Sequence, residues 1–205
     1  MKFNKIVALA FAAVLGFGAQ TANAQSLSPS TKWHWDKGTI VVETPARPAG
    51  QKNVLGLKLP KYKTVRIGLV GLGMRGPGAV DNFCVLPGVE IVALCDFVEA
   101  RAVAQNEKLR KRGLPPAAIY SGENGYKELC ARPDIDLVYI ATDWAHHFPV
   151  AECALKHGKN VADEVPSAMN LEECWKLVDL SEKMQKNCMI LENCCYDWFE
   201  MRTLN

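Results

Sequence analysis

The sequence predicts an α/β fold built on a doubly wound parallel sheet, and two observations support this prediction. From Thr64 onward, short apolar runs alternate with helical stretches, which is typical of parallel strands joined by right-handed crossovers. The first two apolar runs, 65–70 and 89–95, enclose the glycine-rich segment 71–76 (GLGMRG), and the second run is followed by Asp96. A strand, a glycine turn, a helix and a second strand ending in an acid are the pattern of a dinucleotide-binding (Rossmann) domain.

Each glycine of the segment 71–76 has a predicted role. Gly71 allows the tight turn, Gly73 lets the main chain approach a pyrophosphate, and Gly76 lets the helix pack against the strand. The N-terminus of that helix then faces the negative charge of the phosphates. Asp96 follows Gly76 by about 20 residues, where a carboxylate can accept hydrogen bonds from an adenosine ribose. The alternative is a glycine turn with a purely structural role.

The same acid favours NAD over NADP as the cofactor. A 2′-phosphate would face the carboxylate of Asp96, and the next residue, Phe97, offers no cationic partner. NAD is therefore the predicted cofactor.

The later elements follow in regular alternation. We expect helices or strands, in chain order, at 77–86 (helix), 98–112 (helix), 118–120 (strand), 126–131 (helix), 137–140 (strand), 148–157 (helix), 160–162 (strand) and 188–191 (strand). Between the last two, Asn170 and Glu173 form a capping box for a helix that reaches about Lys186. Ligands of a doubly wound sheet bind beyond the carboxyl ends of its strands, so the residues after each strand are the candidate site.

The segment 142–147 (TDWAHH) is the richest of these strand ends. Trp144 can flank a ribose or the nicotinamide, and His146 or His147 can hydrogen-bond ligand hydroxyls or shuttle a proton. The alternative is the N-terminus of a helix, capped by one of the first two residues of the segment, with both histidines half exposed.

Two further strand ends carry polar side chains. Glu164, in the segment 163–166 (DEVP), can meet the nicotinamide end of the cofactor, although a cluster of N-caps before the next helix is the alternative. Asn193 can both donate to and accept from an amide or a ribose. Tyr196 is a candidate general acid or, alternatively, a buried core tyrosine.

The first 24 residues predict a cleaved leader for export. Lys2 and Lys5 precede the apolar stretch 6–17, and the small residues 22–24 (ANA) match a cleavage site. A membrane anchor is the alternative, but a helical span needs about 20 apolar residues. We therefore expect a periplasmic or secreted protein that is free of the membrane after cleavage.

Residues 25–63 predict a linker and an arm before the domain at 64–205. This stretch is polar and contains several prolines, with a stray strand expected at 38–42. Trp33, His34 and Trp35 are either aromatic anchors that hold the arm to the body or a platform that stacks on sugars.

Charge and cysteine spacing exclude several classes of function. The net charge of +2 with no basic stripe argues against nucleic acid as a partner. Six of the eight cysteines fall singly within apolar patterns and predict buried free thiols: Cys84, Cys95, Cys130, Cys153, Cys174 and Cys188. Cys194 and Cys195 are adjacent. Because no Cys/His cluster has zinc spacing, we expect no metal.

Together these segments resemble the large family of secondary-alcohol dehydrogenases typified by glucose–fructose oxidoreductase and inositol dehydrogenase. Those enzymes join a Rossmann domain to an antiparallel-sheet domain. They usually carry Glu-Lys-Pro after the fifth strand, and its lysine serves in proton transfer. Here the segment 164–166 reads Glu-Val-Pro. The missing lysine argues against simple alcohol dehydrogenation.

A closer resemblance is to the NAD-dependent glycosidases of glycoside hydrolase family 109, the α-N-acetylgalactosaminidases. It covers about residues 60–205 and rests on the segments 71–76 (GLGMRG), 94–96 (LCD), 164–166 (EVP), 172–175 (EECW) and 191–196 (LENCCY). The sequence departs from the family at 144–147, where a Trp-x-Trp-His pattern is common, and at Asp163, where a small apolar residue is usual.

The glycine pattern and the family 109 resemblance together give the predicted cofactor site. Its residues are Gly71, Gly73, Met74, Arg75, Asp96, Trp144, Ala145, His146, His147, Glu164, Val165 and Asn193. The resemblance further implies that the antiparallel-sheet domain of the family is missing from this chain, which stops at Asn205, and that the catalytic residues lie beyond it.

The resemblance also implies an exported enzyme that removes terminal α-linked N-acetylgalactosamine. In that mechanism NAD⁺ takes a hydride from the sugar C3, loss of the C2 proton expels the aglycone, water adds at C1, and the hydride returns. The alternatives are an NAD(P)-dependent sugar dehydrogenase or oxidoreductase and a non-catalytic NAD-binding fragment; this chain alone is expected to be inactive. The exact sugar, the aglycone, the oligomeric state and the oxidation state of the cysteines stay open.

Overall fold

The computed structural model describes residues 33–42, 46–47 and 49–203. They fall into two units, a hairpin at 33–42 and a body at 46–203, and each is considered by itself. The predicted leader, residues 1–24, lies outside the described residues.

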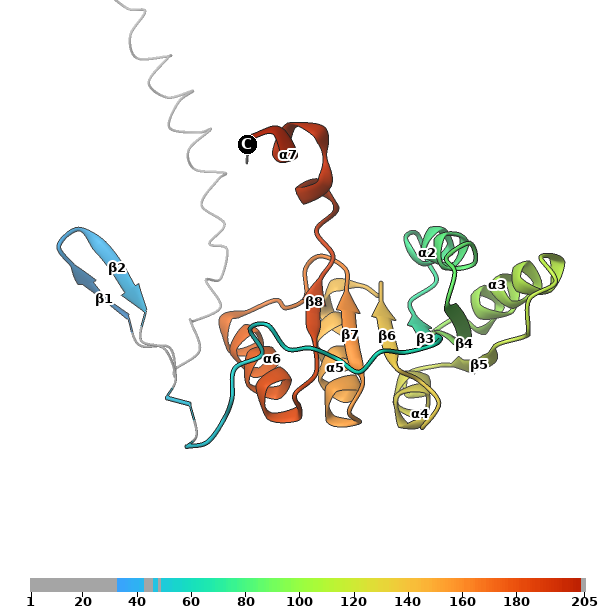
Figure 1. Cartoon of the computed structure of the whole chain (residues 1–205), viewed down its shortest axis with the longest axis horizontal. Helices are drawn as coiled ribbons and strands as arrows, with labels where there is room; N and C mark the ends of the chain where they lie inside the picture. The colour runs from blue at the N-terminus through green and yellow to red at the C-terminus, as the bar shows by residue number, and fades with distance from the viewer. Residues whose placement is uncertain (1–32, 43–45, 48, 204–205) are drawn as a thin grey trace, which may run out of the picture. The chain divides into compact units, whose positions relative to one another are not determined.

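The body is built on a six-stranded parallel sheet (Figure 1). Its strands are β3 (Val65–Val70), β4 (Val89–Asp96), β5 (Ala118–Ser121), β6 (Leu137–Ile140), β7 (Asn160–Asp163) and β8 (Cys188–Ile190). Their order is β5-β4-β3-β6-β7-β8, and every neighbouring pair is parallel. This topology confirms the predicted doubly wound fold, with the order reversing between β3 and β6.

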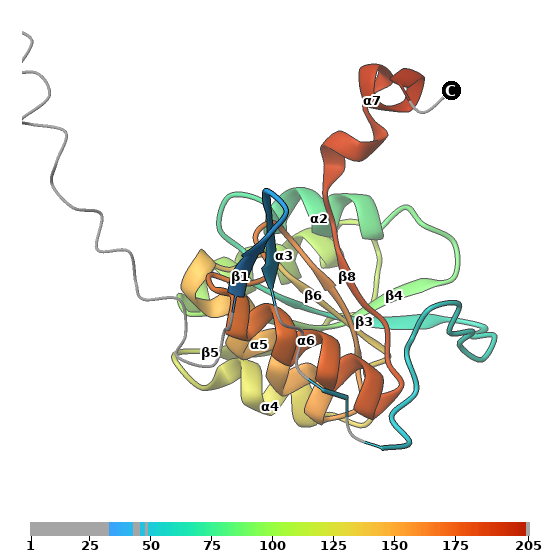
Figure 2. The same ribbon diagram turned by 90° about the vertical axis from the view of Figure 1, so that its left-hand side faces the viewer.

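Helices cover both faces of the sheet. They are α2 (Gly76–Phe83), α3 (Glu99–Lys111), α4 (Gly125–Ala131), α5 (Trp144–Lys156) and α6 (Leu171–Met184). Figure 2 shows α2 and α3 on one face and α4, α5 and α6 on the other. After β8 the chain continues into η1 (Asn193–Tyr196) and α7 (Trp198–Thr203), which project away from the sheet.

Each face of the sheet has its own hydrophobic core. Successive strand residues point to opposite faces, so Leu69 packs under α2 and α3 whereas Val70 packs under α4 and α5. On β6, Val138 and Ile140 join the second core and Tyr139 joins the first. Burial on both faces explains why these strands read as continuous apolar runs rather than alternating ones.

One helix begins earlier than the sequence predicted. The predicted start of α5 was residue 148, but α5 begins at Trp144. Asp143 caps it, because its carboxylate Oδ1 accepts a hydrogen bond of 3.0 Å from the backbone N–H of Ala145. The segment 144–147 is therefore the first turn of a helix, which confirms the alternative interpretation of this segment, with Asp143 as the cap.

The predicted N-cap of α6 is confirmed. Asn170 Oδ1 accepts a hydrogen bond of 2.9 Å from the backbone N–H of Glu173. In return, the Glu173 carboxylate accepts from the backbone N–H of Met169 at 2.8 Å, one residue before the partner of a regular capping box. The helix ends at Met184, where Gln185 takes a left-handed conformation.

Side chains and a carbonyl of the segment 46–63 form hydrogen bonds with α6 and the residue that follows it. Arg47 Nε and Gln51 Nε2 each donate to Glu182 Oε2 at 2.8 Å. Gln185 Nε2 donates to the carbonyl of Lys52 at 2.9 Å. Much of the predicted arm therefore belongs to the body.

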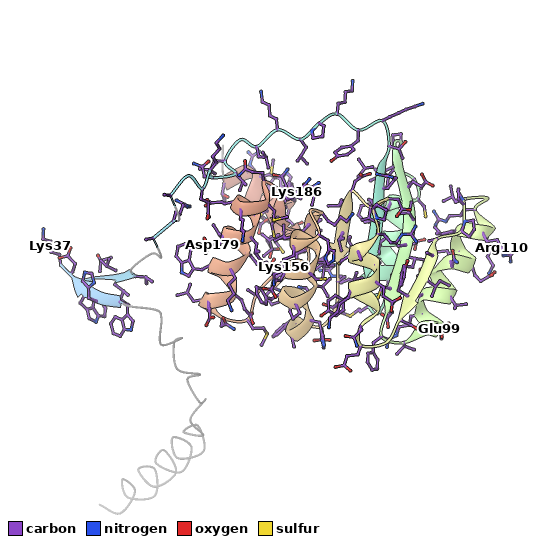
Figure 3. All side chains as sticks on the ribbon, turned by 90° about the horizontal axis from the view of Figure 1, so that it is seen from below. Lys37, Glu99, Arg110, Lys156, Asp179 and Lys186 are labelled. Atoms are coloured by element: carbon purple, nitrogen blue, oxygen red, sulfur yellow. The ribbon has the colours of Figure 1, made fainter. Side chains whose placement is uncertain are left out.

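The hairpin consists of β1 (Trp33–Asp36) and β2 (Thr39–Val42), paired antiparallel. The stray strand predicted at 38–42 is thus the second strand of a hairpin. Trp33 and Trp35 are exposed, and the choice between aromatic anchor and sugar platform stays a prediction. Figure 3 shows Arg110 of α3 at the outer edge of the body.

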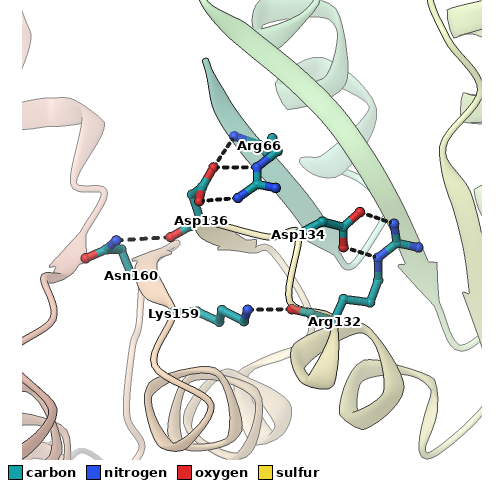
Figure 4. Close-up of polar contacts among 6 residues, drawn as sticks. All are labelled: Arg66, Arg132, Asp134, Asp136, Lys159 and Asn160. Carbon is teal, nitrogen blue, oxygen red and sulfur yellow. Dashed lines mark hydrogen bonds and ion pairs between the residues drawn. The ribbon is translucent and has the colours of Figure 1, made fainter. Parts of the chain in front are cut away.

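A polar clamp joins three strands at their amino ends (Figure 4). Arg66 of β3 donates Nε and Nη2 to the two carboxylate oxygens of Asp136, both at 2.9 Å. The carbonyl of Asp136, just before β6, accepts from Asn160 Nδ2 of β7 at 3.0 Å. The hydrogen bond from Arg66 lowers the pKa of Asp136. The clamp lies at the end of the sheet opposite the candidate site.

The eight cysteines are free thiols. Cys95 and Cys130 are buried and Cys84, Cys153 and Cys188 are partly buried, whereas Cys174 is exposed. The prediction of a buried thiol is wrong for Cys174 because it lies on the outer side of α6. Within the described residues, no three His, Cys, Asp or Glu side chains gather as metal ligands. No helix of the described part is long and apolar enough to span a bilayer.

Candidate nucleotide-binding site

A cavity of about 480 Å³ opens at the carboxyl ends of β3, β4 and β6. This is the point where the strand order reverses, the usual ligand position in such sheets. Its lining residues are Val70, Gly71, Gly73, Met74, Arg75, Cys95, Asp96, Phe97, Arg101, Gly122, Glu123, Tyr126, Ala141, Thr142, Asp143, His146 and Val150.

The glycine turn after β3 has the geometry that a dinucleotide needs. Gly71 has φ +92°, and a Cβ there would lie 2.4 Å from the carbonyl of Ala141. A Cβ at Gly76 would lie 2.1 Å from the carbonyl oxygen of Gly71. Both positions therefore accept only glycine.

Gly73 differs from these two glycines. It is exposed, and a Cβ there would meet only Arg101 Nη1, at 3.7 Å. The space above Gly73 is thus free for a ligand that approaches the backbone. Because α2 begins at Gly76 with Pro77 in its first turn, its N-terminus lies at the edge of the cavity and can face phosphate charge.

Asp96 links this turn to the end of β4. It is buried, with 5% of its surface exposed. Its Oδ2 accepts a 2.7 Å hydrogen bond from the backbone N–H of Leu72, and its Oδ1 accepts one of 2.8 Å from Val98. Each carboxylate oxygen has a second lone pair, so Asp96 can hold the turn and still accept from a ribose hydroxyl.

Arg101 is a site residue that the sequence reasoning missed. It lies in the first turn of α3, its Nη1 is 3.4 Å from Asp96 Oδ1, and it lines the cavity. Phe97 indeed offers no cationic partner to Asp96, but Arg101 of α3 does. The spacing of Arg101, five residues after Asp96 and in the first turn of the predicted helix, could have identified it. A helical side chain points back toward the N-terminus of its helix, and here that direction leads to Asp96.

Phe97, Tyr126 and Val150 give the cavity its apolar walls. Pockets for organic ligands combine such walls with a few polar groups, and an aromatic base suits them. None of these three residues was in the predicted site.

The two histidines in the first turn of α5 lie in different surroundings. His146 lines the cavity, and its Nδ1 lies 2.7 Å from Asp143 Oδ2. His147 is buried, with 1% of its surface exposed. Its Nε2 donates to the carbonyl of Thr142 at 3.1 Å, and its Nδ1 lies 3.1 Å from Asp163 Oδ1. The expectation of a half-exposed His147 is wrong, and the structure does not bring His147 to the cavity.

His147 and Asp163 form a buried pair inside the protein. Since Nε2 of His147 faces the carbonyl of Thr142, it carries a hydrogen. Burial is the largest influence on the pKa of His147 and lowers it, but the contacts with Asp163 and with the backbone of Thr142 and Glu164 together outweigh burial, so the net shift is upward. Burial raises the pKa of Asp163. Asp163, which stands where family 109 proteins usually have a small apolar residue, thus has His147 as a buried partner.

The remaining predicted residues lie around the carboxyl ends of β6 to β8. Glu164 follows β7, and its Oε1 accepts a 2.8 Å hydrogen bond from the hydroxyl of Tyr139. Burial raises the pKa of Tyr139 well above its usual range and so keeps it a donor; its partner Glu164 is half-buried. Trp144, Val165 and Asn193 are exposed.

The predicted site therefore falls into two groups. Six predicted residues line the cavity: Gly71, Gly73, Met74, Arg75, Asp96 and His146. The other six lie outside it: Trp144, Ala145, His147, Glu164, Val165 and Asn193. Their predicted contacts with the nicotinamide end stay predictions. Tyr196, the candidate acid, is exposed on η1.

Comparison with known proteins agrees with this geometry. Residues 65–192 match the family model described as "Oxidoreductase family, NAD-binding Rossmann fold". The chain is 67% identical over 186 residues to glycosyl hydrolase family 109 protein 5 of Phocaeicola vulgatus, a match that covers 91% of this chain and 36% of that protein. It is 60% identical over 207 residues to family 109 protein 4 of the same species, with 40% of that protein covered.

A solved structure supports the cofactor. The myo-inositol dehydrogenase of Lactobacillus casei, in complex with NAD(H) and myo-inositol, matches with a TM-score of 0.60 and 29% identity. The match covers 69% of this chain and 40% of that one. The chain thus spans less than half the length of the relatives and structures named here. The predicted resemblance, the Rossmann fold and NAD as cofactor are confirmed.

Proposed function

This chain belongs to the oxidoreductase family with an NAD-binding Rossmann fold, and on that premise we propose that it supplies the NAD site of a glycosidase of the family 109 type. One observation carries the proposal. The glycine turn, with free space above Gly73, adjoins the cavity at the strand reversal in a chain 67% identical to a family 109 protein.

The residues of the cavity divide the binding of NAD among them. The backbone of the turn and the N-terminus of α2 hold the pyrophosphate. Asp96 accepts from the adenosine ribose, and Phe97 and Tyr126 border the base. Bound NAD supplies reversible hydride acceptance at the sugar, so no external reductant is needed.

The end of β7 favours hydrolysis over simple dehydrogenation. The segment 164–166 has no lysine for proton transfer. Its Glu164 is held in place by Tyr139, beside the buried pair of His147 and Asp163. In our proposal Glu164 and Asn193 border the nicotinamide, and the sugar is a terminal α-linked N-acetylgalactosamine. We also propose export of the protein after cleavage of residues 1–24.

A chimera tests the function. Residues 60–205 replace the matching part of the P. vulgatus family 109 protein 5, with that parent protein as the positive control. We expect release of p-nitrophenol from p-nitrophenyl α-N-acetylgalactosaminide without net accumulation of NADH. A chimera carrying Gly73→Val is the matched negative control.

The second candidate function is an NAD-dependent sugar dehydrogenase. The specific observation in its favour is the likeness to a dehydrogenase bound to NAD(H) and myo-inositol. If NADH accumulates in step with sugar consumption and no p-nitrophenol is released, the protein is a dehydrogenase and the glycosidase proposal is wrong.

A further inference from the structure

Two cysteines from different helices meet beneath the cavity wall. Cys130 of α4 is fully buried, and Cys153 of α5 is partly exposed. Cys153 packs against the buried core cluster that contains Cys130, and the Cys130 thiol lies within hydrogen-bonding reach of the Cys153 sulfur. One helical turn further along α5, His157 Nδ1 lies 3.7 Å from Cys153 Sγ. An accessible thiol, a buried thiol behind it and a histidine beside it thus form one cluster.

The surroundings shift the pKa values of the two thiols in opposite directions. The hydrogen bond from Cys130 lowers the pKa of Cys153, and His157 and Lys127 act in the same direction. The same hydrogen bond raises the pKa of Cys130. Because Cys153 is the accessible sulfur and lies beside His157, it is the one that becomes a thiolate, and a thiolate is the nucleophile in exchange with disulfides.

We propose that Cys153 and Cys130 are a redox-active dithiol that small disulfides convert to an intramolecular disulfide. The Cys153 thiolate attacks one sulfur of an external disulfide, forms a mixed disulfide and expels the first thiolate. Cys130 then loses its proton and attacks Cys153 Sγ, expelling the second. The two protein thiols lose two electrons, and the external disulfide gains them as two thiols.

The other cysteines of the described residues lack this combination. Burial raises the pKa values of Cys95 and Cys188 to about 12, so both stay protonated. Cys174 is exposed on the outer side of α6 and serves as the reference for simple accessibility. An accessible thiol of lowered pKa next to a second thiol is the arrangement found in redox-sensing sites.

The position of the pair relates it to the nucleotide site. Tyr126 lies one turn before Cys130 on α4, and Val150 lies just before Cys153 on α5, and both line the cavity. A disulfide here would join these two cavity walls from behind.

Proteolysis reports on this pair directly. Because Pro133 follows Arg132, trypsin leaves residues 128–156 as one peptide, which contains Cys130 and Cys153 and no other cysteine. The reduced full chain is treated with oxidised glutathione, quenched with acid and digested. We expect a transient glutathione adduct on this peptide, followed by a product lighter by two hydrogen atoms. Further cleavage of this peptide at the aspartates between the two cysteines separates Cys130 from Cys153. The two fragments then stay together only if a disulfide joins them.

The rate of reaction with oxidised glutathione and the behaviour of three cysteine variants test the proposal. Cys153 should react roughly tenfold faster than Cys174, because His157 and Cys130 favour its thiolate form. Cys130→Ala should keep the adduct on Cys153, and Cys153→Ser should leave Cys130 unmodified. Cys188→Ser, which removes a partly buried thiol of the same core, should behave as the wild type.

Two results would overturn the proposal. One is a Cys153 that reacts no faster than Cys174. The other is a glutathione adduct that persists on the wild-type peptide. Both are read on the wild-type chain, so they decide the matter even when Cys130→Ala does not fold.

Discussion

Asp96 shows how one side chain can serve the fold and the ligand together. Its carboxylate accepts backbone hydrogen bonds from Leu72 in the glycine turn and Val98 before α3. It thereby holds the glycine turn against the end of β4. Arg101 completes this corner of the cavity from the first turn of α3.

Removing the carboxylate should weaken both functions. Asp96→Ala should lower the affinity for NAD by about 1.5–3 kcal/mol, the usual range for a charge-assisted hydrogen bond. It should also lower the melting temperature, because the buried N–H of Leu72 loses its partner. Asp96→Asn, which retains an acceptor, should melt closer to the wild type. Calorimetry with NAD and thermal unfolding measure the two effects, and unchanged NAD affinity in both variants would remove Asp96 from the site.

Asp96 and Arg101 should have opposite effects on the choice of cofactor. The carboxylate repels a 2′-phosphate and the guanidinium attracts one, so we expect the chain to bind NAD more tightly than NADP. Arg101→Ala should weaken NADP more than NAD. Calorimetry with both nucleotides tests this, and tighter binding of NADP by the wild type would contradict it.

The glycine turn allows a local test of phosphate binding. Gly73→Val should abolish retention of NAD while the chain stays folded, because the protein leaves free space at this position. Gly76→Ala should instead destabilise the fold, since its Cβ would overlap the carbonyl oxygen of Gly71. Gel filtration with NAD and circular dichroism separate the outcomes. A Gly73→Val chain that still carries NAD would show that the turn is not the phosphate site.

At the scale of elements, the sheet uses its two ends differently. The carboxyl ends of the strands carry the cavity, and the amino ends of β3, β6 and β7 are fixed by the clamp of Arg66, Asp136 and Asn160. Fixing the strands at the far end leaves the other end free to carry turns whose residues line the cavity.

The clamp should make stability depend on pH. Because Arg66 lowers the pKa of Asp136, the folded chain binds fewer protons than the unfolded chain near the unfolded pKa of about 3.9. The stabilisation is complete above that pH and is lost as pH falls through the folded pKa. Asp136→Asn should therefore cost about 1 kcal/mol at pH 7, since Arg66 is partly exposed, and less in acid.

Urea unfolding at neutral and acid pH measures this dependence. Asp134→Asn is the matched control, because Asp134 pairs with Arg132 within one loop and is more exposed than Asp136. An Asp136→Asn variant with the same pH dependence as the wild type would exclude the clamp as its source.

At the scale of the whole molecule, the described residues hold the cofactor cavity but leave much apolar surface uncovered. Met189 and Ile190 of β8 are about half exposed, and Trp198 and Phe199 of α7 are more exposed still. Trp144, Val165 and Asn193 are exposed as well.

We expect residues 25–205 alone to bind NAD weakly and to hydrolyse nothing. Catalysis needs the sugar held against the nicotinamide, where a displacement of about 1 Å can cost 10²-fold. The uncovered apolar surface should also make this fragment prone to aggregate. Release of p-nitrophenol from the α-N-acetylgalactosaminide by the purified fragment, with NAD⁺ present, would refute the prediction.

The sequence by itself determined the order of strands and helices and the position of the glycine turn. These features follow from local patterns: apolar runs, glycine spacing and caps such as Asn170, which act between residues close along the chain. For the same reason the sequence alone could predict that Gly71, Gly73 and Asp96 lie together, and all three line the cavity.

Only the tertiary structure decided which side chains face the cavity and which face one another. Arg101 reaches Asp96, His147 turns inward to Asp163, and Cys130 meets Cys153 because separate elements pack together. Such contacts depend on where each helix begins and how it lies on the sheet. A start of α5 four residues earlier than predicted was enough to bury one histidine and leave its neighbour at the cavity.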